Sequence, residues 1–412
     1  MTLWRNPDFL RFWSAQTISQ FGTQISALAL PLVALLVLHA SAFEVAVLAT
    51  VEWLPWLLFS LPVGAWVDRV HRRPVLILAD LGRGVALLSI PVASALDALT
   101  LGQLYAVAFT TGVLTVFFDV SYQSYLPSLV ERRQLNEGNS KLEISRSAAG
   151  LVGPGVGGVL IGLVTAPVAI LADSISFFVS ALFLGRIRRE ERVPPPQNET
   201  KLLAEIKEGV LYVVRDPYLR PGMATVALSN FFNNVIWTMF LVYAVRSLGW
   251  TPATIGLVFT LGNLGFLAGA AVAPRLSTRL GIGPTLIGTA AFGAWPLVLV
   301  PLAPPEHAIP IVVAVGAVGS FAIVVFNVTA ISLFQAITPD RMLGRMNASR
   351  RFVVWGVIPL GQLTSGALAA SLGLRPTLFV GAVGASFAFL PLLFSPVRGL
   401  RETPEEEPVP AL

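Results

Sequence analysis

The tetrapeptide FDVS at residues 118–121 returns as FNVT at residues 326–329, an offset of 208 residues. Five identities hold at the same offset: Leu135 with Leu343, Asn139 with Asn347, Gly153 with Gly361, Gly158 with Gly366, and Leu160 with Leu368. Both copies lie in strongly apolar surroundings. The repeat therefore predicts two related halves, an architecture that can enclose a cavity open to alternate sides of a bilayer.

The composition requires lipid as a solvent. The chain has 412 residues, of which 55% are hydrophobic and 12% charged, with a mean hydropathy of +0.74. Soluble domains are roughly 25% charged. The net charge of +5 lies in short loops rather than on one face, which argues against nucleic acid as a partner.

The sequence lacks the residues that several kinds of catalytic and metal-binding site require. The chain has no cysteine, and His39, His71 and His307 lie far apart, so we expect no metal and no cofactor. It also lacks a phosphate-binding loop, a G-x-S-x-G motif and an H-E-x-x-H motif, so we do not expect an enzyme or direct use of ATP.

Apolar runs of about 20 residues predict spanning helices, and alternation typical of strands is missing. We expect twelve, at residues 11–38, 43–66, 74–96, 101–125, 144–164, 167–185, 220–245, 252–274, 283–303, 308–335, 347–370 and 374–396. These give a first six-helix bundle (1–185), a cytoplasmic linker with an amphipathic helix (186–219), a second bundle (220–396) and a disordered cytoplasmic tail (397–412).

The charge distribution predicts the orientation. With both termini in the cytoplasm, all 28 lysines and arginines except Arg246 and Arg375 fall on the inner side. This bias is the expected positive-inside pattern, and it supports the number of spans.

The loop between the second and third spans reads GAWVDRVHRRP (64–74). Gly64 would permit close helix approach, Asp68 would face the positive end of a helix, and Arg69 is placed to reach Asp119. We predict a cytoplasmic gate that comprises Gly64, Asp68, Arg69, Arg72, Arg73, Asp80, Arg83, Asp119 and Arg146. The alternative is simple anchoring of the loop by its arginines.

The fifth span contains GPGVGG (153–158), with Gly153, Pro154, Gly157 and Gly158 at its motif positions. Glycine surfaces permit tight helix packing, and proline frees a carbonyl and bends the helix. The alternative is the small-residue packing that is common in membranes.

These stretches resemble the major facilitator superfamily. The loop resembles its G-x-x-x-D-R-x-x-R-[RK] motif, and GPGVGG resembles the G-P-x-x-G-G motif of its exporters. Residues 5–13, 19–22 and 118–158 resemble the branch of enterobactin exporters and macrolide efflux pumps. The resemblance implies an all-α membrane fold with twelve helices in two pseudo-symmetric six-helix bundles, and a cavity lined by spans 1, 4, 7 and 10. One difference is that the fourth span lacks the arginine of the R-x-x-Q-G motif.

Acids deep in a spanning helix cost about 2.5–3.5 kcal/mol on insertion scales and are functional candidates. Glu52 lies nine residues into the second span, and we expect it to bind a coupling proton or a cationic group of the substrate. The alternative is a protonated acid that hydrogen-bonds between helices. We expect Asp119 to pair with Arg69 or Arg146, and Asp173 to be structural.

Amides recur on counterpart spans. Gln16, Gln20 and Gln24 share one face of the first span, and Asn230, Asn233 and Asn234 hold a comparable place in the seventh. Asn327, the counterpart of Asp119, is a further candidate. These residues and Glu52 are predicted to line a substrate or proton cavity. The alternative is hydrogen bonding between helices, worth about 0.6 kcal/mol on average.

The sequence thus predicts a monomeric secondary transporter of the cytoplasmic membrane. It would export an amphipathic organic molecule of drug, antibiotic or siderophore type, coupled to proton entry. Its partners would be the substrate, protons and lipid. The alternative is a receptor or assembly subunit that uses the same fold without transport.

Overall fold

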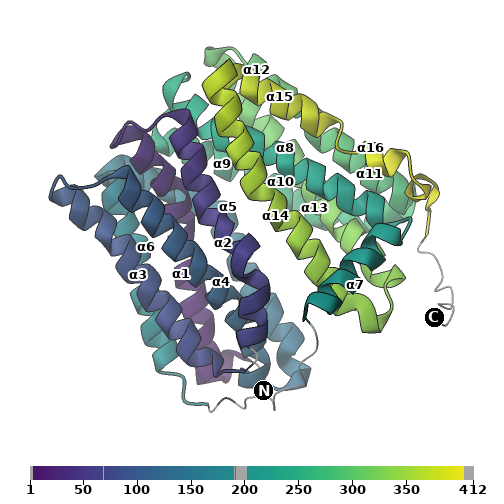
Figure 1. Cartoon of the computed structure of the whole chain (residues 1–412), viewed down its shortest axis with the longest axis horizontal. Helices are drawn as coiled ribbons and strands as arrows, with labels where there is room; N and C mark the ends of the chain where they lie inside the picture. The colour runs from purple at the N-terminus through teal and green to yellow at the C-terminus, as the bar shows by residue number, and fades with distance from the viewer. Residues whose placement is uncertain (1–2, 68, 190, 192–201, 403–412) are drawn as a thin grey trace. The chain divides into compact units, whose positions relative to one another are not determined.

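A computed structural model describes residues 3–67, 69–189, 191 and 202–402 (Figure 1). The described residues contain helices and no strands. The helices of the first half are α1 (Pro7–Leu36), α2 (Ala42–Val67), α3 (Arg72–Ala95), α4 (Leu101–Leu129), α5 (Leu135–Val164) and α6 (Ala166–Gly185). Those of the second half are α7 (Leu202–Arg215), α8 (Leu219–Arg246), α9 (Pro252–Asn263), α10 (Gly265–Leu280), α11 (Ile282–Ala294), α12 (Leu299–Leu302), α13 (Ala308–Ile337), α14 (Asp340–Leu372), α15 (Leu374–Ser386) and α16 (Leu390–Leu393).

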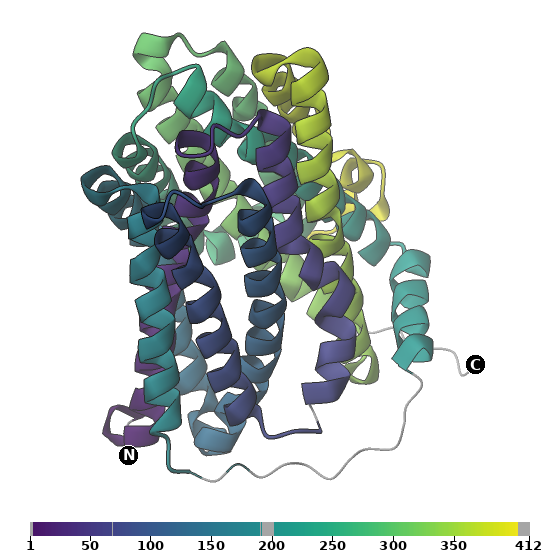
Figure 2. The ribbon, with the colours of Figure 1, turned by 60° about the vertical axis from the view of Figure 1, so that its left-hand side comes forward.

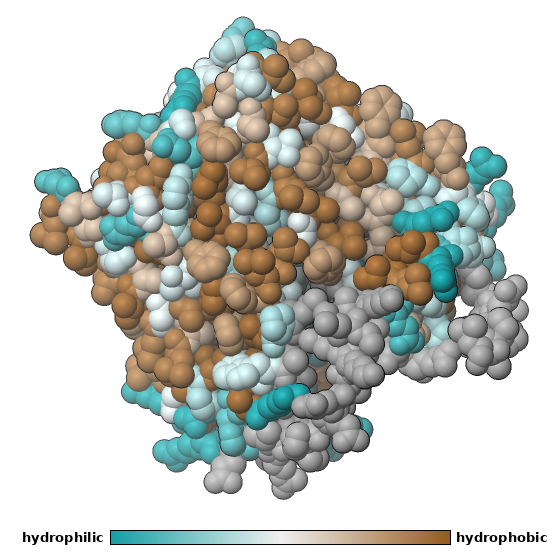
Figure 3. All heavy atoms as spheres, in the orientation of Figure 1, coloured by the Kyte–Doolittle hydropathy of each residue, from teal (hydrophilic) through white to brown (hydrophobic). Residues whose placement is uncertain are grey.

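Twelve stretches in the described residues are long and apolar enough to cross a membrane, which confirms the predicted number. Brown, apolar side chains cover most of the helical surface in view in Figure 3. Three spans are interrupted: α9 and α10 form one, α11 and α12 another with the 3-10 turn η3 (Trp295–Val298), and α15 and α16 the last.

Local signals explain where the first helices begin. Asn6 accepts hydrogen bonds from the backbone N–H groups of Asp8 (3.0 Å) and Phe9 (3.2 Å), and Pro7 occupies the first helical position. Ser41 and Glu44 bond each other's backbone N–H groups at the start of α2, as in a capping box. These capping hydrogen bonds determine the residues at which α1 and α2 begin.

The chain divides into two compact units, Met1–Gln197 with Ala244–Thr260 and Asn198–Tyr243 with Leu261–Leu412. In the first unit α1 contacts α5 and α6, α3 contacts α6 and α4, and α4 contacts α2. Figure 2 shows these long helices side by side. The segment 244–260, which the sequence assigned to the second bundle, packs with the first unit.

In the second unit, α13 contacts α10 and α11, and α14 contacts α7 and α15. The amphipathic helix α7 buries Val213 in an apolar cluster with Leu219, Phe326 and Val397. Part of the predicted linker, residues 190 and 192–201, lies outside the described residues.

Residues 397–402 differ from the disordered tail that we predicted. The turn η5 (Pro396–Gly399) buries Val397, and the Leu400 and Arg401 carbonyls accept hydrogen bonds from Gly283 (2.8 Å) and Ile282 (3.3 Å). Backbone pairing to the start of α11 therefore orders this segment, and only residues 403–412 of the predicted tail lie outside the description.

The repeated tetrapeptides occupy matching environments on α4 and α13. Phe118 and Phe326 are buried in the apolar clusters of their own units. The hydroxyl residues that follow, Ser121 and Thr329, are also buried. The repeat thus encodes equivalent packing positions in the two units.

Candidate functional site

Helix α1, which carries Gln16, Gln20 and Gln24, packs against the GPGVGG motif of α5. Gln16 is buried, and Gln20 and Gln24 are half-buried. A Cβ added to Gly153 would lie 2.5 Å from the Gln24 Cβ, and one added to Gly157 would lie 3.2 Å from the Ile25 Cα. Only glycine permits α1 and α5 to approach this closely, because a side chain at these positions would overlap α1. The GPGVGG motif therefore determines where the Gln24 side chain emerges from the α1–α5 interface.

The second unit repeats this arrangement. A Cβ on Gly361 of α14 would lie 3.0 Å from the Asn234 Cβ and 2.5 Å from the Phe231 carbonyl oxygen. Gly361 is the repeat partner of Gly153, and it contacts Asn234 of α8 as Gly153 contacts Gln24 of α1. In each unit, a glycine of the fifth span therefore packs closely against a residue of the first span that has an amide side chain.

The α8 asparagines use their amide N–H groups within the protein. Asn230 Nδ2 donates to the Val354 carbonyl of α14 (3.1 Å), whereas Asn233 and Asn234 donate to backbone carbonyls one turn earlier on α8 (both 2.8 Å). Within the part of the chain that the structure describes, their Oδ1 atoms accept no hydrogen bond. Asn230 therefore links helices, while three acceptor oxygens remain available to a ligand.

Asn327 lies on α13 with an exposed side chain. Its repeat partner Asp119 on α4 is half-buried. Both residues thus reach the surface of their own units, next to phenylalanines that anchor the core.

Glu52 lies on α2 where this helix approaches α4. Its carbonyl oxygen would be 2.5 Å from a Cβ on Gly112, which explains why α4 has glycine there. The Glu52 side chain is half-buried, and the next residue in sequence is Trp53. Among the described residues Glu52 makes no ion pair and no side-chain hydrogen bond, unlike the half-buried acids Asp8 and Asp216.

The other face of the α5 motif packs on α9. A Cβ on Gly158 would lie 2.9 Å from the Gly256 Cα and would overlap the Pro252 carbonyl oxygen. A Cβ on Gly155 would lie 2.7 Å from the Thr260 Oγ1. This glycine-to-glycine contact is the physical reason that residues 244–260 join the first unit.

The arginine end of the predicted gate loop is tied to α6 and the segment that follows it, while Trp66 packs on Phe117 of α4 with ring centroids 5.5 Å apart. Glu191 accepts from the Arg72 and Arg73 backbone N–H groups (2.7 and 3.2 Å) and from Arg72 Nη1 (3.0 Å). The Arg72 and Glu191 side chains are 7% and 4% exposed. Arg73 Nε donates to the Leu184 carbonyl at the end of α6 (3.0 Å).

The other predicted gate residues lie in varied surroundings. A Cβ on Gly64 would meet no described atom within 4 Å, and the close helix approach that we expected there stays a prediction. Arg69 is exposed, and Asp68 lies outside the described residues. Arg146 bonds Glu143 on its own helix (2.6 and 2.9 Å), and Asp119 lies within electrostatic range of it.

Asp80 and Arg83, which we included in the predicted gate, form a buried ion pair one helical turn apart on α3. Ser180 of α6 donates to the second Asp80 oxygen (2.6 Å). The Arg83 guanidinium lies 4.2 Å from the ring centroids of Phe118 and Phe177. This buried pair contacts side chains of α4 and α6 as well as its own helix, so it links α3, α4 and α6.

Asp173 of α6 is buried against α1. A Cβ on Gly22 would overlap its carboxylate and the Ser176 hydroxyl, which itself donates to the Asp173 carbonyl (2.8 Å). This acid lies in the packed interface between α1 and α6, which is consistent with the structural role that we expected.

Sequence reasoning missed Glu191 and Ser180. Glu191 follows the last span of the first half by a few residues and resembles an ordinary loop acid. Ser180 sits in an apolar helix, where a serine most often bonds its own backbone. No spacing signal links either residue to its partner on α3.

The chain resembles known proteins over almost its full length. The sequence profile of the Major Facilitator Superfamily matches residues 12–358 and 222–411. The multidrug efflux pump Tap of Mycolicibacterium fortuitum is 25% identical, with 94% of this chain and 97% of the pump covered. The enterobactin exporter EntS of Salmonella choleraesuis is 22% identical, with 97% and 95% covered.

Solved structures agree on the fold. A bacterial homologue of the iron transporter ferroportin in an inward-facing state has a TM-score of 0.73 at 16% identity, covering 95% of this chain and 99% of the homologue. A mutant of the nucleoside transporter NupG has a TM-score of 0.74 at 11% identity, covering 94% and 99%. At these identities the likeness concerns the fold alone.

Proposed function

The chain belongs to the major facilitator superfamily, and on this premise we propose that it is a secondary transporter that exports an amphipathic organic molecule by alternating access. The two full-length relatives named above are a multidrug efflux pump and an enterobactin exporter. They support export of an organic compound, and they differ too much from each other to specify which one.

The observation that carries this proposal is a contact that occurs in both units, between a glycine and a residue with an amide side chain. Gly153 packs against Gln24, and Gly361 packs against Asn234. Both sets of amide residues lie on the first membrane span of their unit, and all of them except the buried Gln16 are half-buried. The free Asn230, Asn233 and Asn234 acceptor oxygens suit hydroxyl or ammonium groups of a substrate. In the first unit, the Gln16, Gln20 and Gln24 amides likewise carry groups that can donate or accept hydrogen bonds.

We infer that Glu52 carries the coupling proton. An acid without an ion pair at membrane depth can take up and release a proton as the surrounding helices move, because no fixed cation holds its charge. Tryptophans adjoin it in sequence and could contact an apolar ring of the substrate. Proton entry would then drive export, and the protein would be an antiporter.

The α5–α9 contact supports a gating role for the GPGVGG motif. Gly158 and Gly256 meet without side chains between them, so the two helices can separate without breaking interdigitated packing. Opening and closing of this contact would expose the site to one side of the membrane at a time. The bonds of Arg72 to Glu191 and of Arg73 to the end of α6 would hold α3 and α6 together during this movement.

The charge bias of the loops supports a location in the cytoplasmic membrane of a bacterium, with both termini inside. The protein would act as a monomer, since one chain supplies both halves of the repeat.

The test is transport in everted membrane vesicles, with amphipathic dyes as probes. We expect uptake that requires a proton gradient and collapses with a protonophore. Glu52→Gln should remove the dependence of uptake on external pH. Glu44→Gln, at the exposed start of the same helix, should leave it unchanged. If Glu52→Gln keeps the wild-type rate and pH profile, Glu52 has no part in coupling.

The same vesicles address the alternative of a non-transporting receptor or assembly subunit. Such a protein would bind dye without accumulation, whether or not a gradient is present.

A further inference from the structure

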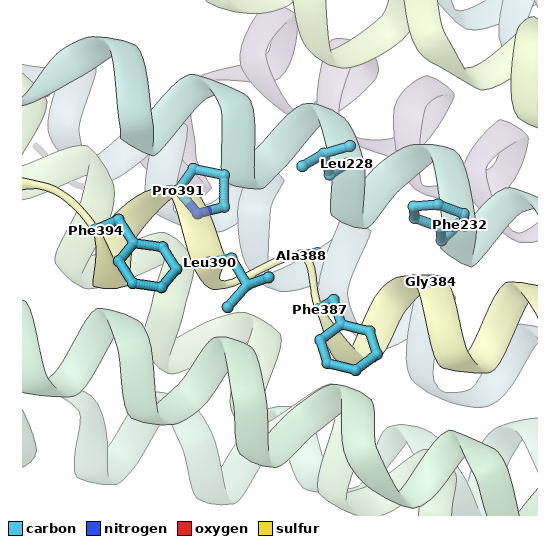
Figure 4. A pocket seen from close by; sticks show the side chains of 8 residues that line it. All are labelled: Leu228, Phe232, Gly384, Phe387, Ala388, Leu390, Pro391 and Phe394. Atoms are coloured by element: carbon cyan, nitrogen blue, oxygen red, sulfur yellow. The ribbon is translucent and has the colours of Figure 1, made fainter.

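An apolar groove lies on the second unit, between α8 and the interrupted helix α15–α16 (Figure 4). Its volume is about 430 Å³. The lining residues are all apolar: Leu228, Phe232, Gly384, Phe387, Ala388, Leu390, Pro391 and Phe394. Such a surface offers no hydrogen-bonding side chain and suits a hydrocarbon chain.

The helix break shapes the groove. The α-helix stops at Ser386 and resumes at Leu390, and Pro391 follows directly. A Cβ on Gly384 would overlap the Phe232 ring, so this glycine lets α8 form the wall. Phe387 and Phe394 remain 57% and 79% exposed. The groove is thus open along its length to the surrounding lipid.

Two segments that carry an exposed arginine meet near one end of the groove. Leu219 at the start of α8, Leu392 of α16 and Val397 of η5 belong to one buried cluster, which places these three segments together. Leu219 and Val397 are each followed directly by an exposed arginine, Arg220 and Arg398.

The acid nearest to Arg220 in sequence is occupied by the backbone, and Glu402, four residues after Arg398, is exposed. Asp216 Oδ1 accepts hydrogen bonds from the Tyr218 and Leu219 N–H groups at 2.8 and 2.7 Å, capping α8. Two exposed arginines therefore lie on segments that meet at Leu392, next to the Pro391 and Phe394 end of the apolar groove.

We propose that this groove binds an anionic glycerophospholipid, with one acyl chain along α8 and its phosphate between Arg220 and Arg398. The inference goes beyond the transport function and does not depend on it. From Leu219 to Phe232 the helix rises roughly 20 Å. One leaflet contributes about half of the ~30 Å hydrocarbon core. The groove therefore matches the depth that a single acyl chain reaches.

The two arginines near one end of the groove favour an anionic lipid over a zwitterionic lipid and over an amphipathic substrate. A zwitterionic lipid would fill the groove equally well but would gain less from two arginines, since its headgroup carries no net charge. An amphipathic substrate needs polar partners, and the lining residues supply none. Basic residues near a membrane surface favour anionic lipid by about 1 kcal/mol each, so two arginines predict a preference of roughly 30-fold.

The experiment is native mass spectrometry of the purified full chain in detergent. The protein is titrated with dioleoyl phosphatidylglycerol and, separately, with dioleoyl phosphatidylcholine, which has the same acyl chains. We expect one phosphatidylglycerol to be retained with an affinity roughly 30-fold above that of phosphatidylcholine.

Variants separate the two parts of the site. Arg220→Gln with Arg398→Gln should abolish the headgroup preference and leave binding of phosphatidylcholine unchanged. Leu228→Gln or Phe394→Ala should weaken both lipids, and the exposure of both side chains limits any effect on folding. The controls are Arg275→Gln and Phe292→Ala, exposed residues of α10 and α11 outside the groove.

Equal affinity for the two lipids in the wild-type protein would overturn the proposal. So would a headgroup preference that survives the double arginine substitution, or wild-type binding in both groove variants. A matching thermal unfolding midpoint for each variant excludes misfolding as the cause of lost binding.

Discussion

Gly158→Ala adds one methyl group at the point where α5 meets α9. The new Cβ would lie 2.9 Å from the Gly256 Cα and 3.1 Å from its backbone nitrogen, and would overlap the Pro252 carbonyl oxygen. All of these atoms belong to backbone, so no side-chain rotation can relieve the overlap. The α5–α9 contact must open for the methyl group to fit.

The cost follows from two opposing terms. Overpacking of this kind destabilises by about 1–3 kcal/mol. Alanine also favours the helix over glycine by up to about 1 kcal/mol, in every conformation of the transporter. Only the first term differs between the packed and separated states of α5 and α9. The equilibrium between these states should therefore shift by roughly 5- to 150-fold.

Gly162→Ala is the matched control, because its Cβ would meet only the Ala253 Cβ, at an ordinary 3.8 Å. We expect Gly158→Ala to reduce dye export at least fivefold at equal expression, and Gly162→Ala to stay within about twofold of wild type. The assay is initial-rate efflux from loaded cells. Wild-type export by Gly158→Ala would refute the view that this contact closes during the transport cycle.

Two further variants test the scaffold of the first unit by thermal unfolding in detergent. Asp80→Asn leaves the buried Arg83 guanidinium without its counter-charge and should destabilise by about 3–5 kcal/mol, whereas Glu143→Gln, in a pair 58–65% exposed, should cost less than about 1 kcal/mol. Glu191→Ala removes the acceptor for two backbone N–H groups and the buried Arg72 side chain, and should also cost about 3–5 kcal/mol. An unfolding midpoint within about a degree of wild type would remove either residue from the scaffold.

The spans could be predicted because hydropathy over about 20 residues is a local property. The Asp80–Arg83 pair could also be predicted, since one helical turn separates the two residues. The helix breaks at Leu264 and Phe387 could not, because apolar runs continue through them.

Contacts between residues far apart in the sequence could least be predicted. GPGVGG indicated close packing, but its composition does not say that Gly153 meets α1 while Gly158 meets α9. Glu191 lies 119 residues from Arg72, and only the folded chain reveals their pairing.

The most direct test of alternating access is a reversible lock between α5 and α9. Gly162→Cys and Ala253→Cys would place two Cβ atoms 3.8 Å apart, the usual separation in a disulfide, and the chain has no cysteine of its own. The proposal predicts that oxidation links the pair and stops export, that a reductant restores it, and that each single variant is insensitive to both treatments. Full export by the crosslinked protein would contradict alternating access through this contact.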